Sequence, residues 1–268
     1  MMQQAMDFRQ ESLTLKSLIQ DLDDTAFEAV TQFKGWTIND VLRHLHFWNK
    51  AVMVASQGEE AFSEFFQGVG AHMAKGGSLP EYEKHYLQGL SGGALRSTWS
   101  DLVDETAEAY AAMDPSVRVP WAGPSMSARS SISARQMETW AHGQEVFDVL
   151  GAEREEHDRI RNIVVLGVNT FGWTFRVRNE TPPEPMPYVE LIAPSGALWT
   201  YGDPQKDNVI SGDAVDFARV VTQTRNVADT GLTVIGGPAE TWMSKAQCFA
   251  GAASPPPAKG SRFKKARG

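Results

Sequence analysis

The sequence has a single cysteine, Cys248, so no disulfide can form within the chain. The chain does not start with a charged segment followed by an apolar one. It also has no apolar run near the roughly 18 residues that a membrane-spanning helix needs. These absences predict a cytoplasmic protein in a reducing compartment, without a membrane partner. Cys248 lies between Gln247 and Phe249, where a lone small thiol is expected to pack in the core and not to act as a nucleophile.

Basic residues are fewer than acidic residues outside the last ten positions. The 268 residues have a formal net charge of -8. The end of the chain nevertheless contains five basic residues and no acidic one: Lys259, Arg262, Lys264, Lys265 and Arg267. The rest of the chain is therefore more acidic than the total suggests, which argues against nucleic acid as a partner.

Helical periodicity dominates the first half of the chain. Apolar residues recur at helical spacing in four segments, which are 8–33, 37–55, 93–113 and 131–151. Between the second and third segments, residues 57–90 are less regular because glycines interrupt them, and three phenylalanines (62, 65 and 66) suggest a short apolar segment that covers a pocket. We therefore predict a four-helix unit over residues 1–151.

The second half has mixed signals. A helix is expected over 158–173 and strands over 188–193, 197–201 and 232–235. Residues 211–213 are expected to cap a helix that runs through about Thr222, and a final helix is expected over 239–249. The proline-rich, basic end has the composition of a disordered segment. We predict an α+β protein that is mainly α, with a helical bundle at 1–151, a small α+β domain at 152–251 and a disordered basic tail at 252–268.

Two candidate metal ligands lie on the fourth predicted helix. Glu138 and His142 are four residues apart, so their side chains share one helical face and converge on one point. Such a pair also occurs by chance as solvated or hydrogen-bonded side chains. The second predicted helix offers His44 and His46, each about 100° from the centre of its apolar face by the 3.6-residue period, so periodicity does not choose between them.

The donor set indicates the kind of ion. Two histidines and one carboxylate are typical of a hydrolytic-type zinc site with a fourth position open. Facing helices of a bundle are a common place for such a site. Zinc is the first candidate, and nickel, copper and iron also accept imidazole ligands.

A loop rich in proline, serine and glycine, residues 114–130, precedes the fourth helix and contains Trp121. We predict that Trp121 forms a wall of the site and contributes to cofactor binding. A plain surface connection is the alternative, and an aromatic patch of this kind is also compatible with packing between two copies. The sequence therefore leaves a monomer and a homodimer equally open.

Two segments carry a resemblance to a known family. Gly35–Trp48, together with Met137–Gln144, resembles the metal-binding domain of mycothiol-dependent maleylpyruvate isomerases, which belong to the DinB-like superfamily of metal-binding four-helix bundles. The order of the helices, His-Leu followed by an aromatic residue, and the Glu-x-x-x-His pair match over residues 8–151. The resemblance implies that His44, and not His46, joins Glu138 and His142 as a metal ligand.

The same resemblance implies an activity. A divalent metal, with zinc first, and a low-molecular-weight thiol such as mycothiol would serve as cofactors, and the thiolate would add to an unsaturated small acid. The outcome would be cis/trans isomerisation or thiol transfer. In the smaller domain, Arg225 ends a segment similar to one whose terminal arginine is tied to activity, although this chain has one extra residue between the threonine and the arginine. An arginine binds a carboxylate bidentately, and an arginine favoured by the helix dipole is the alternative.

Two other functions share the same candidate site. In a metal-dependent hydrolase or hydratase, the three ligands would activate water and Glu145 would serve as the base, unless it is simply solvated. In a non-catalytic binding protein, the bundle would hold a metal and the mixed domain a small apolar ligand. Turnover without an added thiol would favour the first alternative, and no turnover at all would favour the second.

Overall fold

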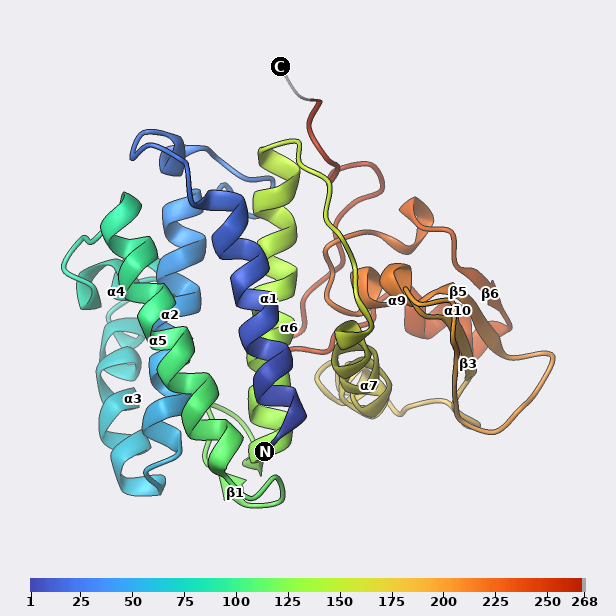
Figure 1. Ribbon diagram of the computed structural model, residues 1–268. Coiled ribbons are helices and arrows are strands. Elements are labelled where there is room, and N and C mark those ends of the chain that lie inside the picture. The colour runs from blue at the N-terminus through green and yellow to red at the C-terminus, as the bar shows by residue number, and fades with distance from the viewer. Residues whose placement is uncertain (267–268) are drawn as a thin grey trace. The chain divides into compact units, whose positions relative to one another are not determined.

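The protein is mainly helical, with a small sheet in its C-terminal part. The computed structural model describes residues 1–266. The chain divides into two compact units, Met1–Val149 and Leu150–Gly268 (Figure 1). The fold class expected from the sequence, a helical bundle followed by a small α+β domain, is confirmed. Within the described residues, no helix is both long enough and apolar enough to cross a membrane.

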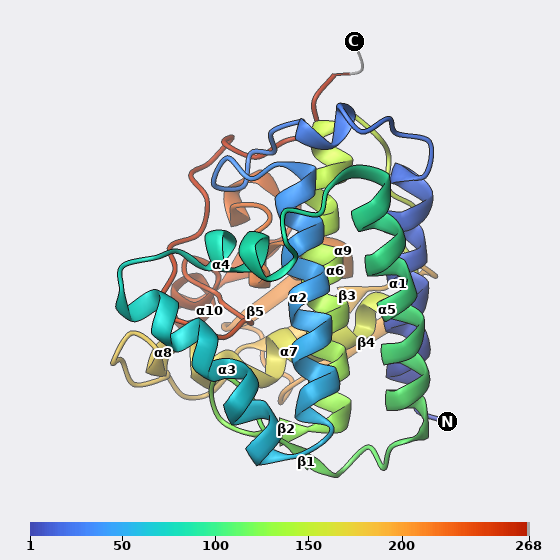
Figure 2. The same ribbon diagram turned by 90° about the vertical axis from the view of Figure 1, so that its left-hand side faces the viewer.

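The first unit is built on four long helices that lie side by side in both views (Figures 1 and 2). They are α1 (Gln3–Ile19), α2 (Ile38–Ala55), α5 (Gly92–Ala112) and α6 (Ala128–Val149). Helices α1 and α2 each pack against both α5 and α6. Fully buried aromatic side chains, among them Phe8, Trp99 and Trp140, fill the interior. Large buried rings supply much of the apolar area that stabilises such a bundle.

The first helix is shorter than its periodicity predicts. One helix was expected over residues 8–33, but α1 ends at Ile19 and the following loop contains only a short 3-10 helix, η1 (Ala26–Glu28). The Asp23 carboxylate accepts hydrogen bonds from the backbone N–H of Ala26 and from the hydroxyl of Thr25. Such local bonds from an aspartate to the backbone compete with helix formation, and the prediction of one continuous helix is wrong.

The segment expected to be irregular, residues 57–90, contains two helices. These are α3 (Glu59–Ala74) and α4 (Leu79–Tyr86), and both pack against α2 (Figure 2). Helix α4 starts at a capping box in which Ser78 and Glu81 satisfy each other's backbone N–H groups. The loop before α6 forms a two-stranded ribbon of β1 (Arg118–Val119) and β2 (Met126–Ser127).

The second unit begins with helical segments in place of the single helix expected over 158–173. A 3-10 turn η2 (Asp158–Ile160) is followed by α7 (Arg161–Asn169) and α8 (Phe171–Arg176). Later in the unit come α9 (Ala214–Val221), η3 (Val227–Asp229) and α10 (Gly237–Met243). Helix α7 packs against α9 at Gly167, where a Cβ atom would lie 2.9 Å from Val221 Cγ2. Helix α9 begins directly after Asp213, as the predicted cap at 211–213 requires, whereas α10 is shorter than the helix expected over 239–249.

The sheet of the second unit has the strand order β4-β3-β5-β6. Its strands are β3 (Tyr188–Ile192), β4 (Leu198–Tyr201), β5 (Val209–Asp213) and β6 (Thr233–Ile235). The hairpin of β3 and β4 and the strand at β6 follow the sequence pattern, whereas β5, which pairs in parallel with β3, was not expected. The inward side chains of Val189, Leu191 and Ile210 are fully buried.

The end of the chain is held by hydrogen bonds within the second unit. Residues 252–266 form no helix or strand. Nevertheless, Arg178 Nη2 donates to the Ser254 carbonyl at 2.6 Å and Asn226 Nδ2 donates to the Pro257 carbonyl at 2.8 Å. These bonds join the end of the chain to the rest of the unit, and the disorder expected from its composition stays a prediction. Arg267 and Gly268 lie outside the described residues.

Candidate metal centre

Three side chains from two neighbouring helices meet in the first unit. His44 comes from α2, and Glu138 and His142 come from α6. One possible ligand atom from each lies within 4.8 Å of the others. Glu138 Oε2 is 3.1 Å from His142 Nε2 and 3.5 Å from His44 Nε2. The structure thus brings together the three residues that were predicted as metal ligands.

Local sequence explains how each helix presents its ligand. On α6 the spacing of four residues places Glu138 and His142 one turn apart on the same face. On α2 the start of the helix is defined by Thr37, whose hydroxyl accepts from the Asp40 N–H while the Asp40 carboxylate accepts from the Thr37 N–H. This capping box sets the register in which His44 points toward α6.

The charge states of Glu138 and His142 suit a cation. Burial alone would raise the pKa of Glu138, but hydrogen bonds to His142 and His44 lower it well below the usual 4.5. Burial lowers the pKa of His142, a shift that its hydrogen bond to Glu138 only partly opposes. A charged carboxylate and a neutral imidazole are the forms in which these groups bind metals. The donor set therefore fits a divalent ion such as zinc.

His44 behaves differently because two carboxylates flank it. Burial lowers its pKa, but the negative charge of Glu83 and the hydrogen bonds to Glu138 and Glu83 together raise the pKa to about 9. His44 Nδ1 is 2.8 Å from Glu83 Oε1, and Glu83 is only 1% exposed. Sequence reasoning missed Glu83 because its helix, α4, was not predicted, although the capping box of Ser78 and Glu81 was a visible signal.

A buried arginine on α6, whose charge acts on Glu138 and Glu83, was also missed. Arg135 on α6 is 1% exposed, and its Nε donates to Asn49 Oδ1 at 3.0 Å. Burial lowers the pKa of Arg135 to about 10, opposed by the negative charges of Glu138 and Glu83. At neutral pH the guanidinium therefore remains charged and offsets part of the charge of the two carboxylates.

Aromatic rings surround the three candidate ligands. Trp36 stacks on His142 with ring centroids 5.5 Å apart, and Phe33 meets the same imidazole edge-on at 5.0 Å. Glu138 has the most exposed side chain of the three, 24% against 10% for His44 and 11% for His142. Access is therefore widest beside the carboxylate, while the imidazoles are shielded from water.

Trp121 is separated from the candidate ligand His44 by the ring of Trp48. Its ring packs on Trp48 at 5.1 Å and on Phe62 at 6.0 Å, and Trp48 in turn meets His44 at 6.1 Å. Trp121 belongs with Phe62 and Trp48 to an apolar cluster that also includes Val119 of β1. The predicted wall position is compatible with this placement, and a role in cofactor binding stays a prediction.

Two other residues considered from the sequence, His46 and Glu145, lie outside the cluster. Burial and the nearby charge of Lys50 lower the pKa of His46 to about 4, and within the described part of the chain its Nδ1 has no hydrogen-bond partner. Glu145 lies on α6 three residues after His142. Neither is among the three residues whose ligand atoms converge.

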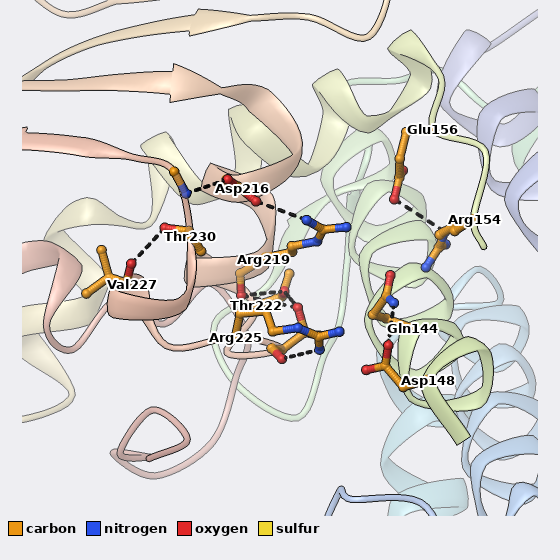
Figure 3. Close-up of polar contacts among 12 residues, drawn as sticks. Gln144, Asp148, Arg154, Glu156, Asp216, Arg219, Thr222, Arg225, Val227 and Thr230 are labelled. Atoms are coloured by element: carbon orange, nitrogen blue, oxygen red, sulfur yellow. Dashed lines mark hydrogen bonds and ion pairs between the residues drawn. The ribbon is translucent and has the colours of Figure 1, made fainter. Parts of the chain in front are cut away.

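Arg225 belongs to the second unit, just beyond α9. The chain turns there at Gln223, whose φ is +59°, and Thr224 N–H donates to the Arg219 carbonyl at 2.9 Å. Arg225 Nη1 donates to the Thr224 carbonyl at 2.8 Å, while Arg219 bonds to Asp216 at 3.0 Å (Figure 3). The turn thus gives Arg225 a defined backbone position, and its contact with a substrate stays a prediction.

Comparisons with known proteins agree on one family. Residues 8–147 match the family described as the mycothiol maleylpyruvate isomerase N-terminal domain. An uncharacterized protein of Mycobacterium tuberculosis strain H37Rv is 35% identical over 254 residues, which is 95% of this chain and 96% of that protein. An uncharacterized protein of Mycobacterium tuberculosis strain CDC 1551 / Oshkosh matches to the same extent.

Solved structures show a similar fold. The crystal structure of the mycothiol-dependent maleylpyruvate isomerase has a TM-score of 0.56 and 18% identity, and the match covers 86% of this chain and 91% of that one. A mutant of the mycothiol-dependent maleylpyruvate isomerase has a TM-score of 0.50, also with 18% identity, over 81% and 87% of the two chains.

Proposed function

Because this chain belongs to the family of the mycothiol maleylpyruvate isomerase N-terminal domain, we propose that it is a metal-dependent enzyme that adds a low-molecular-weight thiolate to an unsaturated small acid. The observation that carries the proposal is the convergence of His44, Glu138 and His142 within 4.8 Å. Zinc is the first candidate ion for two imidazoles and a carboxylate. When bound, such an ion supplies a Lewis acid that lowers the pKa of a thiol, so that thiolate is available near neutral pH.

The protein side chains have separate tasks in this proposal. Glu138 and the two histidines hold the ion and leave one position open, and Trp36 and Phe33 keep water away from the imidazole of His142. Trp121 contributes to the wall against which the thiol lies. Arg225 binds the carboxylate of the acid through its two parallel N–H groups.

The reaction follows from the chemistry of an activated double bond. The thiolate sulfur forms a bond to one alkene carbon, and the electron pair of the double bond moves onto the conjugated carbonyl. The remaining single bond rotates, and return of the electron pair restores the alkene and expels the thiolate. Isomerisation therefore consumes no thiol, whereas protonation of the adduct gives thiol transfer. By analogy with the named relatives, mycothiol and maleylpyruvate are the first thiol and acid to try.

The first test is the metal content of the purified protein. Wild type is compared with His44→Ala and His142→Ala by elemental analysis, at matched helix content by circular dichroism. About one zinc or similar ion per wild-type chain, lost in both variants, is expected if the three residues form one site. A wild type that holds no metal and takes up none of zinc, nickel or iron would contradict the proposal.

The second test is thiol dependence. Conversion of maleylpyruvate is followed with and without mycothiol, before and after removal of metal by a chelator. The proposal expects turnover that requires both thiol and metal. Turnover without any thiol would instead support the metal-activated-water hydrolase or hydratase, and a metal-loaded protein without turnover would support a binding protein.

A further inference from the structure

Glu83 contacts His44 from the side opposite to the other two candidate ligands. The two ring nitrogens of His44 face different carboxylates, Nδ1 that of Glu83 at 2.8 Å and Nε2 that of Glu138 at 3.5 Å. We propose that Glu83 is the positioning residue of the metal centre, which accepts the Nδ1–H hydrogen bond of His44 and thereby directs Nε2 to the ion. This inference rests on the proposed metal site and adds a residue that lies outside it.

The fold holds Glu83 in place by contacts that do not involve the site. The capping box of Ser78 and Glu81 sets the start of α4. Tyr82 and Tyr86 then pack edge-on against Phe47 of α2, at centroid distances of 5.7 and 5.2 Å. Phe47 is three residues beyond His44, and Tyr86 is three residues beyond Glu83. The contact of Tyr86 with Phe47 thus lies about one helical turn from the contact of Glu83 with His44, along the same two helices. Packing of the aromatic rings therefore fixes the position of Glu83 relative to His44.

The hydrogen bond determines which nitrogen is available. An imidazole that binds a metal has one N–H and one lone pair, so an acceptor at Nδ1 keeps the proton there and leaves the Nε2 lone pair for the ion. Metal-bound histidines commonly donate their other ring N–H to a carboxylate in this way, which fixes the tautomer and raises the basicity of the ligand. Without Glu83, His44 would also populate the tautomer that has its proton toward Glu138.

Burial of the Glu83 carboxylate costs free energy, and this cost supports a functional role. A buried carboxylate is unfavourable unless its oxygens are paired. Glu83 is 1% exposed, and no described residue donates a hydrogen bond to its Oε2. Its Oε1 pairs with His44 Nδ1, and the charge of Arg135 offsets part of its negative charge. A side chain that served only to stabilise the bundle would be replaced at lower cost by an apolar residue of the same size.

The test compares zinc affinity in three variants of the full-length protein. Glu83→Met removes the charge and the acceptor at similar volume, and Glu83→Gln removes the charge while its amide oxygen can still accept. Glu64→Gln is the matched control, because it removes an exposed carboxylate from the adjacent helix α3. The dissociation constant for zinc is measured by competition with a chelator. Ring nitrogen shifts of His44 are recorded by NMR in the zinc-bound state, and circular dichroism verifies folding.

The expected result is zinc binding weakened about 10- to 100-fold in Glu83→Met, less in Glu83→Gln, and unchanged in Glu64→Gln. In the zinc-bound wild type the proton of His44 should reside on Nδ1. Wild-type affinity in both folded Glu83 variants would overturn the inference while leaving the metal site intact. A wild type without zinc would overturn the metal site, and the role of Glu83 with it. If Glu83→Met does not fold, Glu83→Gln still decides the question.

Discussion

The indole of Trp36 lies face to face with the imidazole of His142, with ring centroids 5.5 Å apart and planes inclined by only 10°. Trp36 sits in the turn before α2, directly after Lys34 and Gly35, both of which have positive φ. The stack therefore links the start of α2 to a candidate ligand on α6. It restrains the orientation of an imidazole that also forms a hydrogen bond to Glu138 and an edge-on contact with Phe33.

We expect Trp36→Leu to weaken metal binding without abolishing it. An aromatic pair contributes about 0.5–1.5 kcal/mol beyond its buried area, so the loss of the stack corresponds to an affinity lower by up to about tenfold. Zinc affinity by chelator competition checks this, with Trp121→Leu as the control at another tryptophan of the first unit. An unchanged dissociation constant in Trp36→Leu would mean that the stack with Trp36 does not help to orient His142.

Trp121→Leu should instead affect the thiol. The Trp121 ring reaches His44 only through Trp48, so its loss is not expected to change the metal content. If the ring forms the wall of the thiol site, KM for the thiol should rise severalfold, because an aromatic surface of this kind contributes about 1 kcal/mol of contact. Steady-state kinetics at varied thiol concentration measure the effect. A normal KM would assign Trp121 to packing of the loop.

Arg225→Ala should raise KM for the unsaturated acid while zinc affinity stays at the wild-type value. Hydrogen bonds to a charged group contribute about 1.5–3 kcal/mol, so a change of about 10- to 100-fold is expected. Arg225→Lys should recover only part of the loss, since an ammonium group cannot bind a carboxylate bidentately. Arg176→Ala, at an exposed arginine of α8, is the control. Equal kinetics in all three variants would exclude Arg225 from substrate binding.

The stability contributed by Glu81 should depend on pH. Hydrogen bonds from the backbone N–H and the hydroxyl of Ser78 lower the pKa of Glu81 below its usual 4.5. A carboxyl group with a lowered pKa in the folded state stabilises the protein above the unfolded pKa, and this contribution is lost as pH falls through the folded value. Glu81→Gln should therefore be less stable than wild type at pH 7, and the difference should shrink as the pH is lowered below about 4.5.

Urea unfolding at a series of pH values measures this difference. Ser78→Ala removes the hydroxyl partner of the same capping box, so the double variant should lose little more than either single one. A difference between wild type and Glu81→Gln that is independent of pH would show that the capping box does not depend on the charge of Glu81.

Helical periodicity alone places Glu138 and His142 correctly, because the 3.6-residue repeat is a local property of the chain. Periodicity also predicts α5 and α6 to within a few residues at each end. Periodicity does not choose between His44 and His46, which flank the apolar face of α2 symmetrically. Resemblance to a family indicates His44, and in the structure it is His44 whose Nε2 comes within 3.5 Å of Glu138.

Other features depend on contacts between distant residues. Strand β5 is completed by pairing with β3 and β6. Glu83 is 39 residues from His44 in the chain, and it reaches the imidazole only because α4 docks on α2 through tyrosines that pack on Phe47. Local patterns report which face of a helix is apolar. Tertiary packing decides which polar side chains meet across that face. The reason is that the docking of two helices sets how residues far apart in the chain are aligned.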